Sequence, residues 1–286
     1  MTEATLPIAR TVADMRRRLD AWRAAGQTIG MVPTMGALHE GHLSLVAQAR
    51  ARADRVITSI FVNPAQFAPG EDFDAYPRSE SRDAALLADA GCDLLFAPSA
   101  GEMYPPGFTT TVTVSGVSEP LDGHARPAHF SGVATVVAKL LIQARPDVAV
   151  FGEKDYQQLQ VIKRLAVDLD LPTAIFGAPT VRAEDGLALS SRNAYLSPVE
   201  RKIAAGLNVV LLNLARALAA GSPVAPAEAE AIEALLAAGF ESVDYIEARH
   251  ADTLERLGPG PVGNAPARVL AAARLGKTRL IDNRAV

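Results

Sequence analysis

The stretch TIGMVPTMGALHEGHLSLV, residues 28–46, decides the fold of this chain. It begins as an apolar run at 28–32, passes through a turn that contains Gly36, and continues as a helical pattern that starts close to Gly41. A strand, a tight turn and a helix in this order form the unit from which parallel α/β sheets are built. We therefore expect His39 and His42 to lie on either side of the start of a helix.

The same alternation continues along the first 180 residues. Further apolar runs lie at 56–62, 93–98, 147–152 and 174–177, and helical patterns lie at roughly 41–52, 79–90, 131–145 and 155–168. This order predicts an α/β fold with a doubly wound parallel sheet and right-handed crossovers, a Rossmann-like arrangement. Ligands of such folds bind beyond the carboxyl ends of the strands, so residues that follow the strands are the candidates for a site.

A second region begins where the alternation stops, which predicts two domains, 1–180 and 181–286. The second region contains a helical pattern at 198–220 and a turn-rich, alanine-rich segment at 221–231 that we interpret as an exposed connection. Strand patterns at 243–249 and within 268–283 predict a small separate sheet. We expect a C-terminal α+β domain that acts as a lid.

Composition excludes several classes of protein. The chain has 286 residues, 49% hydrophobic and 21% charged residues, a net charge of -4 and a pI near 5.8, which argue against a nucleic-acid partner. The apolar stretch at 132–144 is interrupted and too short to span a membrane. Cys92 is the only cysteine and the first ten residues lack a secretory pattern, so we expect a cytoplasmic protein without membrane contact.

The helix start near Gly41 has the features of a phosphate site. Backbone N–H groups and the positive end of the helix dipole point at such a position, and imidazoles can add further donors. An H-x-x-H pair alone is more often structural, and His39 and His42 could also join His124 and His129 around zinc. The spacing differs from the H-E-x-x-H pattern of zinc helices, which makes the phosphate interpretation the stronger one.

Two other segments carry candidates for phosphate chemistry. GEKD at 152–155 follows a predicted strand, so we expect Lys154 to project at the same end of the sheet as His42, although a lone lysine is usually just solvated. Its charge could offset the charge that develops on an attacked phosphate. DGLALSSRN at 185–193 offers two hydroxyls and the guanidinium of Arg192, which can bind phosphate oxygens bidentately. A helix N-cap is the weaker alternative for a serine at this position.

Several stretches together resemble one known family. TMGALHEGH at 34–42 is similar to the H-x-G-H signature of the nucleotidylyltransferase superfamily, in the form used by the pantothenate synthetase family. Further similar stretches, in the same order, are FVNPAQF at 61–67, AYPR at 75–78, GEKDYQQL at 152–159, LALSSRNAYL at 187–196 and ARLGKTRLIDN at 273–283. Ala65 stands where methionine is expected and Asp122 where glutamate is expected.

The resemblance implies an activity. A member of this family joins (R)-pantoate to β-alanine with ATP, through a pantoyl-adenylate, and releases AMP and pyrophosphate. Catalysis then comes from alignment of the reactants and fixed positive groups, without a protein nucleophile. The resemblance also implies Mg²⁺ on the phosphates and a homodimer, which an exposed apolar strand at 56–62 or 109–114 could support.

The resemblance also assigns residues to roles. The catalytic candidates are His42, His39, Lys154 and Arg192. Among them, His42 is the first candidate for a general acid. The ATP-binding candidates are Met35, Gly36, Ala37, Leu38, His39, Glu40, Gly41, His42, Gly152, Glu153, Lys154, Asp155, Val181, Leu189, Ser190, Ser191 and Arg192. Candidates for binding pantoate and β-alanine are Gln66, Gln158, Met35, Asn63 and Arg126. Tyr76 and His129 are weaker candidates, which could either line the site or support its structure. Asp155 and Asp83 are the candidate magnesium ligands.

Two alternatives remain open at this point. Another nucleotidylyltransferase would transfer AMP or CMP to a phosphorylated acceptor and would need no amine. A nucleotide-binding regulator would bind ATP tightly without releasing AMP. Dependence on pantoate and β-alanine separates both alternatives from the ligase.

Overall fold

A computed structural model describes residues 6–286, which form two compact units. Unit 1 comprises the described residues up to Ser115 together with Arg126–Glu153 and Val161–Pro179. Unit 2 comprises Thr180–Val286 and two short segments, Gly116–Ala125 and Lys154–Gln160, that precede the expected domain boundary in the sequence. The helix α7 (Tyr156–Asp168) is therefore divided: its residues 156–160 belong to unit 2, and its residues 161–168 belong to unit 1.

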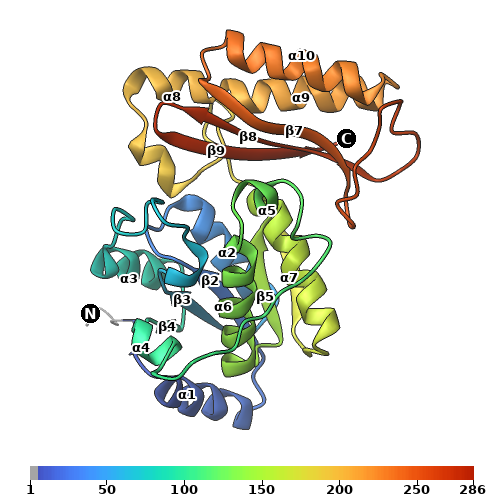
Figure 1. Ribbon diagram of the computed structural model, residues 1–286. Helices are drawn as coiled ribbons and strands as arrows, with labels where there is room; N and C mark the ends of the chain where they lie inside the picture. The colour runs from blue at the N-terminus through green and yellow to red at the C-terminus, as the bar shows by residue number, and fades with distance from the viewer. Residues whose placement is uncertain (1–5) are drawn as a thin grey trace. The chain divides into compact units, whose positions relative to one another are not determined.

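Unit 1 is built on a six-stranded sheet in which all neighbouring strands are parallel (Figure 1). Its strands, in chain order, are β1 (Ile8–Ala9), β2 (Ile29–Thr34), β3 (Arg55–Ile60), β4 (Leu94–Phe96), β5 (Val148–Gly152) and β6 (Ala174–Ala178). Their spatial order is β1-β4-β3-β2-β5-β6. The predicted doubly wound parallel sheet is confirmed, and the connections that leave the neighbouring strands β2 and β5 run in opposite directions across the sheet.

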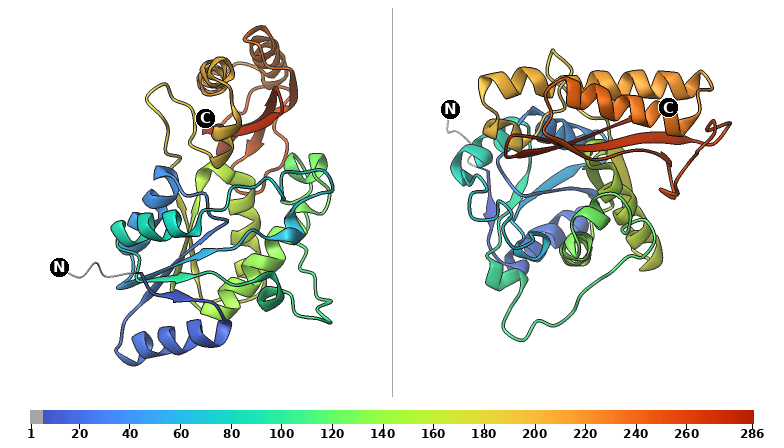
Figure 2. Two further views of the ribbon diagram at one scale, coloured as in Figure 1. Left: turned by 90° about the vertical axis from the view of Figure 1, so that its left-hand side faces the viewer. Right: turned by 45° about the horizontal axis from the view of Figure 1, so that its top comes forward.

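Helices cover both faces of this sheet (Figure 2). They are α1 (Val12–Ala24), α2 (Glu40–Arg50), α3 (Glu80–Asp89), α4 (Ala100–Met103), α6 (His129–Ala144) and α7 (Tyr156–Asp168), with 3₁₀ turns η1 (Pro64–Gln66) and η2 (Glu153–Asp155). Right-handed crossovers place α2 and α3 on one face and α1 and α6 on the other. Leu45, Val46 and Leu87 of α2 and α3 pack on Val32 and Leu95 of the sheet, which fixes α2 in place.

Unit 2 contains a three-stranded antiparallel sheet with the order β7-β8-β9. Its elements are α5 (Asp122–Ala125), η3 (Ser191–Tyr195), α8 (Pro198–Ala204), α9 (Gly206–Ala219), α10 (Val224–Ala237), β7 (Ser242–His250), β8 (Ala267–Leu275) and β9 (Thr278–Ala285). Helices α9 and α10 pack side by side against the sheet (Figure 1). Leu211, Leu235 and Val269 lie at the centre of this core, so the predicted small separate sheet is confirmed.

Two expectations about exposed segments are wrong. Most of the expected connection at 221–231 belongs to α10, because Val224, Ala231 and Leu235 recur at helical spacing and are buried against unit 2. The strand expected to be exposed at 56–62 is β3, which is paired on both sides by β2 and β4 and is largely buried. The other strand candidate, 109–114, has no strand structure, and its Val112 N–H donates instead to Thr135 Oγ1 at 2.9 Å.

One helical stretch, Pro198–Ala219, is long and apolar enough to cross a membrane by length and composition alone. In the structure it comprises α8 and α9. Leu207, Leu211, Leu214 and Leu218 of α9 are buried in the unit 2 core, as expected of a core helix.

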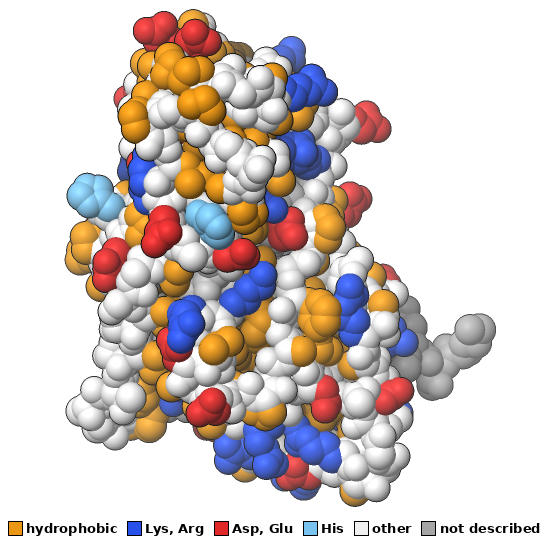
Figure 3. Space-filling model, turned by 90° about the vertical axis from the view of Figure 1, so that its right-hand side faces the viewer, with side chains coloured by type: hydrophobic (Ala, Val, Ile, Leu, Met, Phe, Trp, Pro, Cys, Tyr) orange, Lys and Arg blue, Asp and Glu red, His pale blue; other side chains and the backbone are white. Residues whose placement is uncertain are grey.

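Basic side chains gather at the end of unit 1 where α1 lies (Figure 3). Helix α1 carries four arginines, and three of them pair with aspartates one turn away on the same helix. Exposed pairs of this kind contribute little to stability, so we interpret the α1 surface as a solvated helix face.

Candidate active site

The predicted histidine pair forms the N-terminal cap of α2. His39 is the N-cap residue, its Nδ1 accepts from the Gly41 N–H at 3.1 Å, and the His39 N–H donates to His42 Nδ1 at 3.4 Å. The two rings lie 4.1 Å apart between centroids. Because Nδ1 of each ring is an acceptor, the proton of each neutral imidazole lies on Nε2, where it can serve as a donor.

The turn before α2 is held by Asp83 of α3. Its two carboxylate oxygens accept from the Ala37 and Leu38 N–H groups, both at 2.9 Å, and the side chain is buried. Gly36 has a φ of +83°, and a Cβ there would lie 3.1 Å from Asp83 Oδ2 and from Ile60 Cγ2. Asp83 therefore shapes the backbone of the predicted phosphate turn, and both its oxygens are engaged in doing so.

Gln66 lies next to Met35, and both are candidates for pantoate binding. Gln66 Nε2 lies 3.0 Å from Met35 Sδ, and Gln66 Oε1 accepts from Asn63 Nδ2 at 3.0 Å. Asn63 is buried and also binds the Gly132 carbonyl at 3.1 Å and the Tyr104 hydroxyl at 2.6 Å. Burial raises the pKa of Tyr104 to about 12, so this hydroxyl stays a donor. Asn63 thus orients the side-chain amide of Gln66 through this hydrogen bond.

Arg126 forms a bidentate ion pair with Glu71 in the loop that follows η1. The two N–O distances are 2.6 and 2.7 Å, and the Ala68 N–H donates to the same carboxylate at 3.1 Å. Burial raises the pKa of Glu71, but hydrogen bonding and the charge of Arg126 outweigh this effect, so the net pKa lies below its ordinary value. The substrate-binding candidate Arg126 is therefore engaged with a protein carboxylate in this structure.

His129 connects Arg126 to Gln66. Arg126 Nη1 lies 3.0 Å from His129 Nε2, and His129 Nδ1 lies 2.8 Å from the Gln66 carbonyl oxygen. Because arginine only donates, Nε2 accepts and Nδ1 carries the proton that binds the carbonyl. Tyr76 is buried, with its ring 6.1 Å from that of Phe67. Both weaker candidates thus have supporting contacts within unit 1.

The second phosphate motif follows the strand next to β2. Gly30 and Met31 of β2 pair with Val148 and Ala149 of β5, so the two strands end at the same edge of the unit 1 sheet. Gly152 ends β5 and Glu153 begins η2 there. This edge, beside the α2 cap, is where doubly wound sheets bind nucleotides.

Lys154 and Asp155 continue η2 and belong to unit 2. The Lys154 ammonium lies 3.8 Å from Asp155 Oδ1, and the Lys154 side chain is only 17% exposed. The Lys154 carbonyl accepts from Asn283 Nδ2 of β9 at 2.9 Å. The backbone of this motif is therefore fixed by the C-terminal sheet.

The third motif extends from a small hairpin in unit 2. The Leu189 N–H donates to the Val181 carbonyl at 3.0 Å, and Arg182 pairs with Ala188 across the hairpin. Ser190 then caps η3, since its hydroxyl accepts from the Arg192 N–H at 3.3 Å. The N-cap interpretation of this serine is confirmed, and the capped turn carries Ser191 and Arg192.

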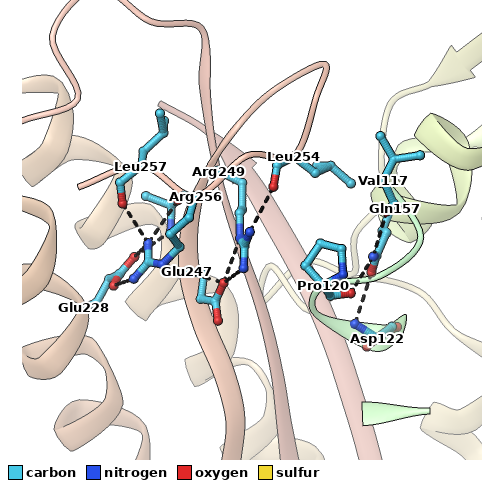
Figure 4. A network of polar contacts seen from close by, with 11 residues as sticks. Val117, Pro120, Asp122, Gln157, Glu228, Glu247, Arg249, Leu254, Arg256 and Leu257 are labelled. Carbon is cyan, nitrogen blue, oxygen red and sulfur yellow. Dashed lines mark hydrogen bonds and ion pairs between the residues drawn. The ribbon is translucent and has the colours of Figure 1, made fainter. Parts of the chain in front are cut away.

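Two adjacent glutamines of α7 have different surroundings. Gln157 is buried, accepts from the Asp122 N–H at 3.1 Å and donates to the Val117 and Pro120 carbonyls (Figure 4). Gln158, the substrate candidate, is only partly buried. The carboxylate of Asp122 accepts from the Tyr245 hydroxyl at 2.8 Å and from Arg279 Nη2 at 2.6 Å. Asp122, where the resemblance led us to expect glutamate, thus anchors α5 to the C-terminal sheet.

Among residues 6–286, no group of three histidine, cysteine, aspartate or glutamate side chains could hold a metal ion. Cys92 is buried, its thiol lies 3.3 Å from Thr58 Oγ1, and burial raises its pKa. Cys92 is therefore a small side chain of the unit 1 core.

Several residues that shape these motifs are absent from the sequence-based candidates. Glu71, Tyr104, Arg182, Asp282 and Asn283 contact motif residues or their neighbours. Asp282 and Asn283 lie in the stretch 273–283, which resembles the family without carrying an assigned role. That unexplained resemblance is the signal that could have identified them.

A doubly wound parallel sheet with a glycine turn and a capped helix at its switch point is typical of nucleotide-binding α/β proteins. Comparison with known proteins narrows this class. The chain matches the Pantoate-beta-alanine ligase family over residues 7–285, and it belongs to that family. It is 66% identical over 279 residues to the pantothenate synthetase of Caulobacter vibrioides, with 98% of each chain covered. It is 59% identical over 278 residues to that of Rhodospirillum rubrum, with 97% and 98% covered.

Solved structures agree with this assignment. The crystal structure of pantothenate synthetase from Thermus thermophilus has a TM-score of 0.91 at 49% identity, covering 98% of this chain and 99% of that one. Pantoate-beta-alanine ligase from Francisella tularensis, complexed with beta-gamma ATP and beta-alanine, has a TM-score of 0.82 at 35% identity, with 98% and 97% covered.

Proposed function

We propose that the chain joins (R)-pantoate to β-alanine with ATP and forms pantothenate, AMP and pyrophosphate. The observation that carries the proposal is family membership over nearly the whole chain, with 66% identity to a pantothenate synthetase. The ligands of the Francisella relative, beta-gamma ATP and beta-alanine, agree with two of the three substrates.

In the first step, a pantoate carboxylate oxygen attacks the α-phosphate, and the bond to pyrophosphate breaks. The N-terminus of α2 and the Nε2–H groups of His39 and His42 are suited to bind phosphate oxygens as charge moves onto the leaving group. Lys154 and Arg192 would add fixed positive charge. The Nδ1 contact of His42 leaves the proton of the neutral imidazole on Nε2, where it can donate a hydrogen bond to a phosphate oxygen. The general-acid role that the resemblance implies would require the imidazolium form, in which the Nδ1 contact is lost.

In the second step, the β-alanine amine attacks the acyl carbon of the adenylate. The bond to AMP breaks, and the amine loses a proton. This step needs alignment more than a protein nucleophile. We assign no residue as the base for the amine.

The proposed ATP residues belong to three segments of the chain. They are Met35–His42, Gly152–Asp155, and Leu189–Arg192 together with Val181, whose carbonyl accepts from the Leu189 N–H. The resemblance of all three motifs to one family supports a common nucleotide. Closure of the C-terminal domain as a lid would exclude water from the adenylate, which hydrolyses readily.

For pantoate we propose Gln66 and Gln158, with Met35 beside Gln66. Amides can donate to a carboxylate and to hydroxyls. Asn63 would act through its hydrogen bond to Gln66. Arg126 already contacts Glu71 through Nε and Nη2, so a substrate carboxylate would compete with Glu71 for bidentate binding.

We propose that magnesium enters the site as a complex with the ATP phosphates. The described residues contain no group of three ligands, and magnesium usually takes one or two carboxylates, phosphate oxygens and several waters. The exposed Asp155 carboxylate beside Lys154 fits one such position. Bound magnesium would neutralise phosphate charge.

A cytoplasmic homodimer is proposed from the family resemblance. The buried, unpaired thiol of Cys92 agrees with a reducing compartment. Light scattering at two protein concentrations tests the dimer, and a monomer at both would contradict it.

The decisive experiment measures AMP and pyrophosphate from purified protein with ATP and Mg²⁺. Pantoate and β-alanine are supplied together and then omitted in turn. The proposal expects AMP and pantothenate in equal amounts only when both are present. Turnover that ignores pantoate and β-alanine would contradict it, and turnover with a phosphorylated acceptor alone would indicate another nucleotidylyltransferase.

A further inference from the structure

Two adjacent residues of β9 contact different segments of unit 2: one contacts the Lys154 motif, and the other contacts the hairpin that carries the Ser190–Arg192 turn. Asn283 Nδ2 donates to the Lys154 carbonyl at 2.9 Å. Asp282 accepts from Arg182 at 2.6 and 2.8 Å, and Arg182 belongs to the hairpin that leads into Ser190. We propose that Asp282 and Asn283 are positioning residues for adenylation, which set the spacing between Lys154 and the Ser190–Arg192 turn. This inference rests on the proposed function.

The contact from Asn283 is oriented by its own surroundings. Asn283 is 3% exposed, and its Oδ1 accepts from Arg268 Nη1, which fixes the amide so that Nδ2 faces Lys154. The Arg268 guanidinium lies 3.8 Å from the centre of the Tyr156 ring. Since Tyr156 is two residues after Lys154, β8 and β9 hold this turn at two points.

The contact from Asp282 reaches its motif through a rigid hairpin. Arg182 Nη1 also donates to the Gly186 carbonyl at 3.1 Å, and the hairpin is closed by the Leu189–Val181 hydrogen bond. Asn193 Nδ2 donates to the Ala188 carbonyl at 3.0 Å, which joins η3 to the hairpin. A bidentate arginine–carboxylate pair is geometrically specific, so a shift of Asp282 would be passed to Ser190 and Arg192.

The strand geometry explains how adjacent residues reach separate segments. Successive side chains of a strand point to opposite faces of the sheet. Asn283 shares its face with Arg279, which binds Asp122, so this face of β9 holds both short segments that join unit 2 from earlier in the chain. Asp282 points to the other face. Strand β9 therefore contacts the Lys154 turn from one face of the sheet and the hairpin that leads to Ser190 from the other face.

The test compares three isosteric substitutions. Asp282→Asn weakens the pair with Arg182, and Asn283→Asp keeps the acceptor for Arg268 but removes the donor to Lys154. The matched control is Glu228→Gln, because Glu228 is buried like Asp282 and binds Arg256 bidentately (Figure 4). Glu228 also accepts from the Ala248 N–H, and neither Ala248 nor Arg256 belongs to one of the three motifs. All three should lower the melting temperature.

The readout is pantoate-dependent exchange of labelled pyrophosphate into ATP, which reports adenylation alone. We expect Asp282→Asn and Asn283→Asp to lower kcat for exchange by about tenfold or more, since small misplacements of reacting groups are costly. Glu228→Gln should stay close to wild type in exchange. Asn283→Ala, which removes both amide contacts without adding charge, should be impaired like Asn283→Asp.

Two results would overturn the inference. One is wild-type exchange in the β9 variants at a temperature where they are folded. The other is an equal loss in Glu228→Gln, which would mean that the rate follows stability. If the wild-type protein itself shows no pantoate-dependent exchange, the proposed function fails instead.

Discussion

His39 and His42 bind each other across the first turn of α2, with the His39 N–H donating to His42 Nδ1 at 3.4 Å. The same His39 uses its own Nδ1 to accept from the Gly41 N–H. Each imidazole thus combines a structural nitrogen, which caps the helix, with an Nε2 that can act on a ligand. This division of labour allows stability and catalysis to be separated by mutation.

The first prediction separates the two nitrogens of His42. In His42→Asn, the side-chain oxygen can replace Nδ1 as the cap acceptor, but no donor replaces Nε2. We expect a melting temperature near wild type and a fall in kcat of about 10²–10³, as for loss of one transition-state donor. In His42→Ala the cap is also lost, at a cost of about 1 kcal/mol in unfolding free energy.

His42→Gln is the matched control, because its amide nitrogen can take the place of Nε2. It should keep more activity than His42→Asn. Steady-state AMP release and thermal melts of the three variants give the comparison. Wild-type turnover in His42→Asn would rule out a catalytic role for the Nε2 proton of His42, and activity in His42→Gln as low as in His42→Asn would indicate proton transfer in place of hydrogen bonding.

The second prediction concerns the close approach of α6 to η1. A Cβ on Gly132 would lie 2.2 Å from the Ala65 carbonyl oxygen and 2.7 Å from Gln66 Cα. Gly132→Ala should therefore displace η1, lower the free energy of unfolding by about 1–3 kcal/mol and raise KM for pantoate through Gln66.

Gly101→Ala in α4 is the control, because a Cβ there would meet only Ser99 Oγ at 3.9 Å. It should be neutral or stabilising, as alanine favours helices by up to about 1 kcal/mol over glycine. Urea denaturation and pantoate titration measure both effects. An unchanged KM for pantoate in Gly132→Ala would mean that the position of η1 does not affect pantoate binding.

The sequence predicts the sheet and the helix start well, because both depend on local patterns. The strands at 28–32 and 147–152 are short apolar runs, and the helix after His39 begins within two residues of the predicted position. Strand order then places the turns after β2 and β5 at one edge.

Contacts between distant parts of the chain are not readable in the same way. Asp83 binds the turn 45 and 46 residues earlier, and Asp282 binds Arg182 from 100 residues away. A carboxylate on a helix or strand looks alike in the sequence whether it faces water, a metal or a backbone N–H. Helix α10 escapes prediction for another reason, since Gly221, Pro223 and Pro226 suggest turns although the buried positions follow helical spacing.

The third prediction concerns the ion pair of Glu71 with Arg126. Because the pKa of Glu71 is lowered in the folded protein, its contribution is fully present above the ordinary value of 4.5 and is lost as pH falls through the folded value. Glu71→Gln should open the loop at neutral pH, and acid should open it in the wild type. Chymotrypsin cleavage at Phe67 and Phe73 measures the opening in Glu71→Gln at neutral pH, and pepsin, an aspartic protease active in acid, measures it in the wild type at low pH.

Glu80→Gln provides the control, because Glu80 pairs with Arg10 at an exposed position and also has a lowered pKa. Loss of an exposed pair should leave cleavage of the loop unchanged. Equal protection of wild type and Glu71→Gln at neutral pH would mean that the ion pair does not hold the loop.

The last prediction separates the two aspartates that the sequence offers as magnesium ligands. Both Asp83 oxygens accept backbone N–H groups of the turn before α2. In Asp83→Asn, one of these N–H groups would face an amide donor, so we expect a loss of about 1–3 kcal/mol in unfolding free energy and a raised KM for ATP. Asp155→Asn removes a 47% exposed carboxylate and should hardly change stability. A titration of Mg²⁺ at saturating ATP distinguishes them: the concentration for half-maximal rate should rise in Asp155→Asn and stay unchanged in Asp83→Asn. The opposite pattern would make Asp83 the magnesium ligand, and its two backbone hydrogen bonds would then have to break when ATP binds.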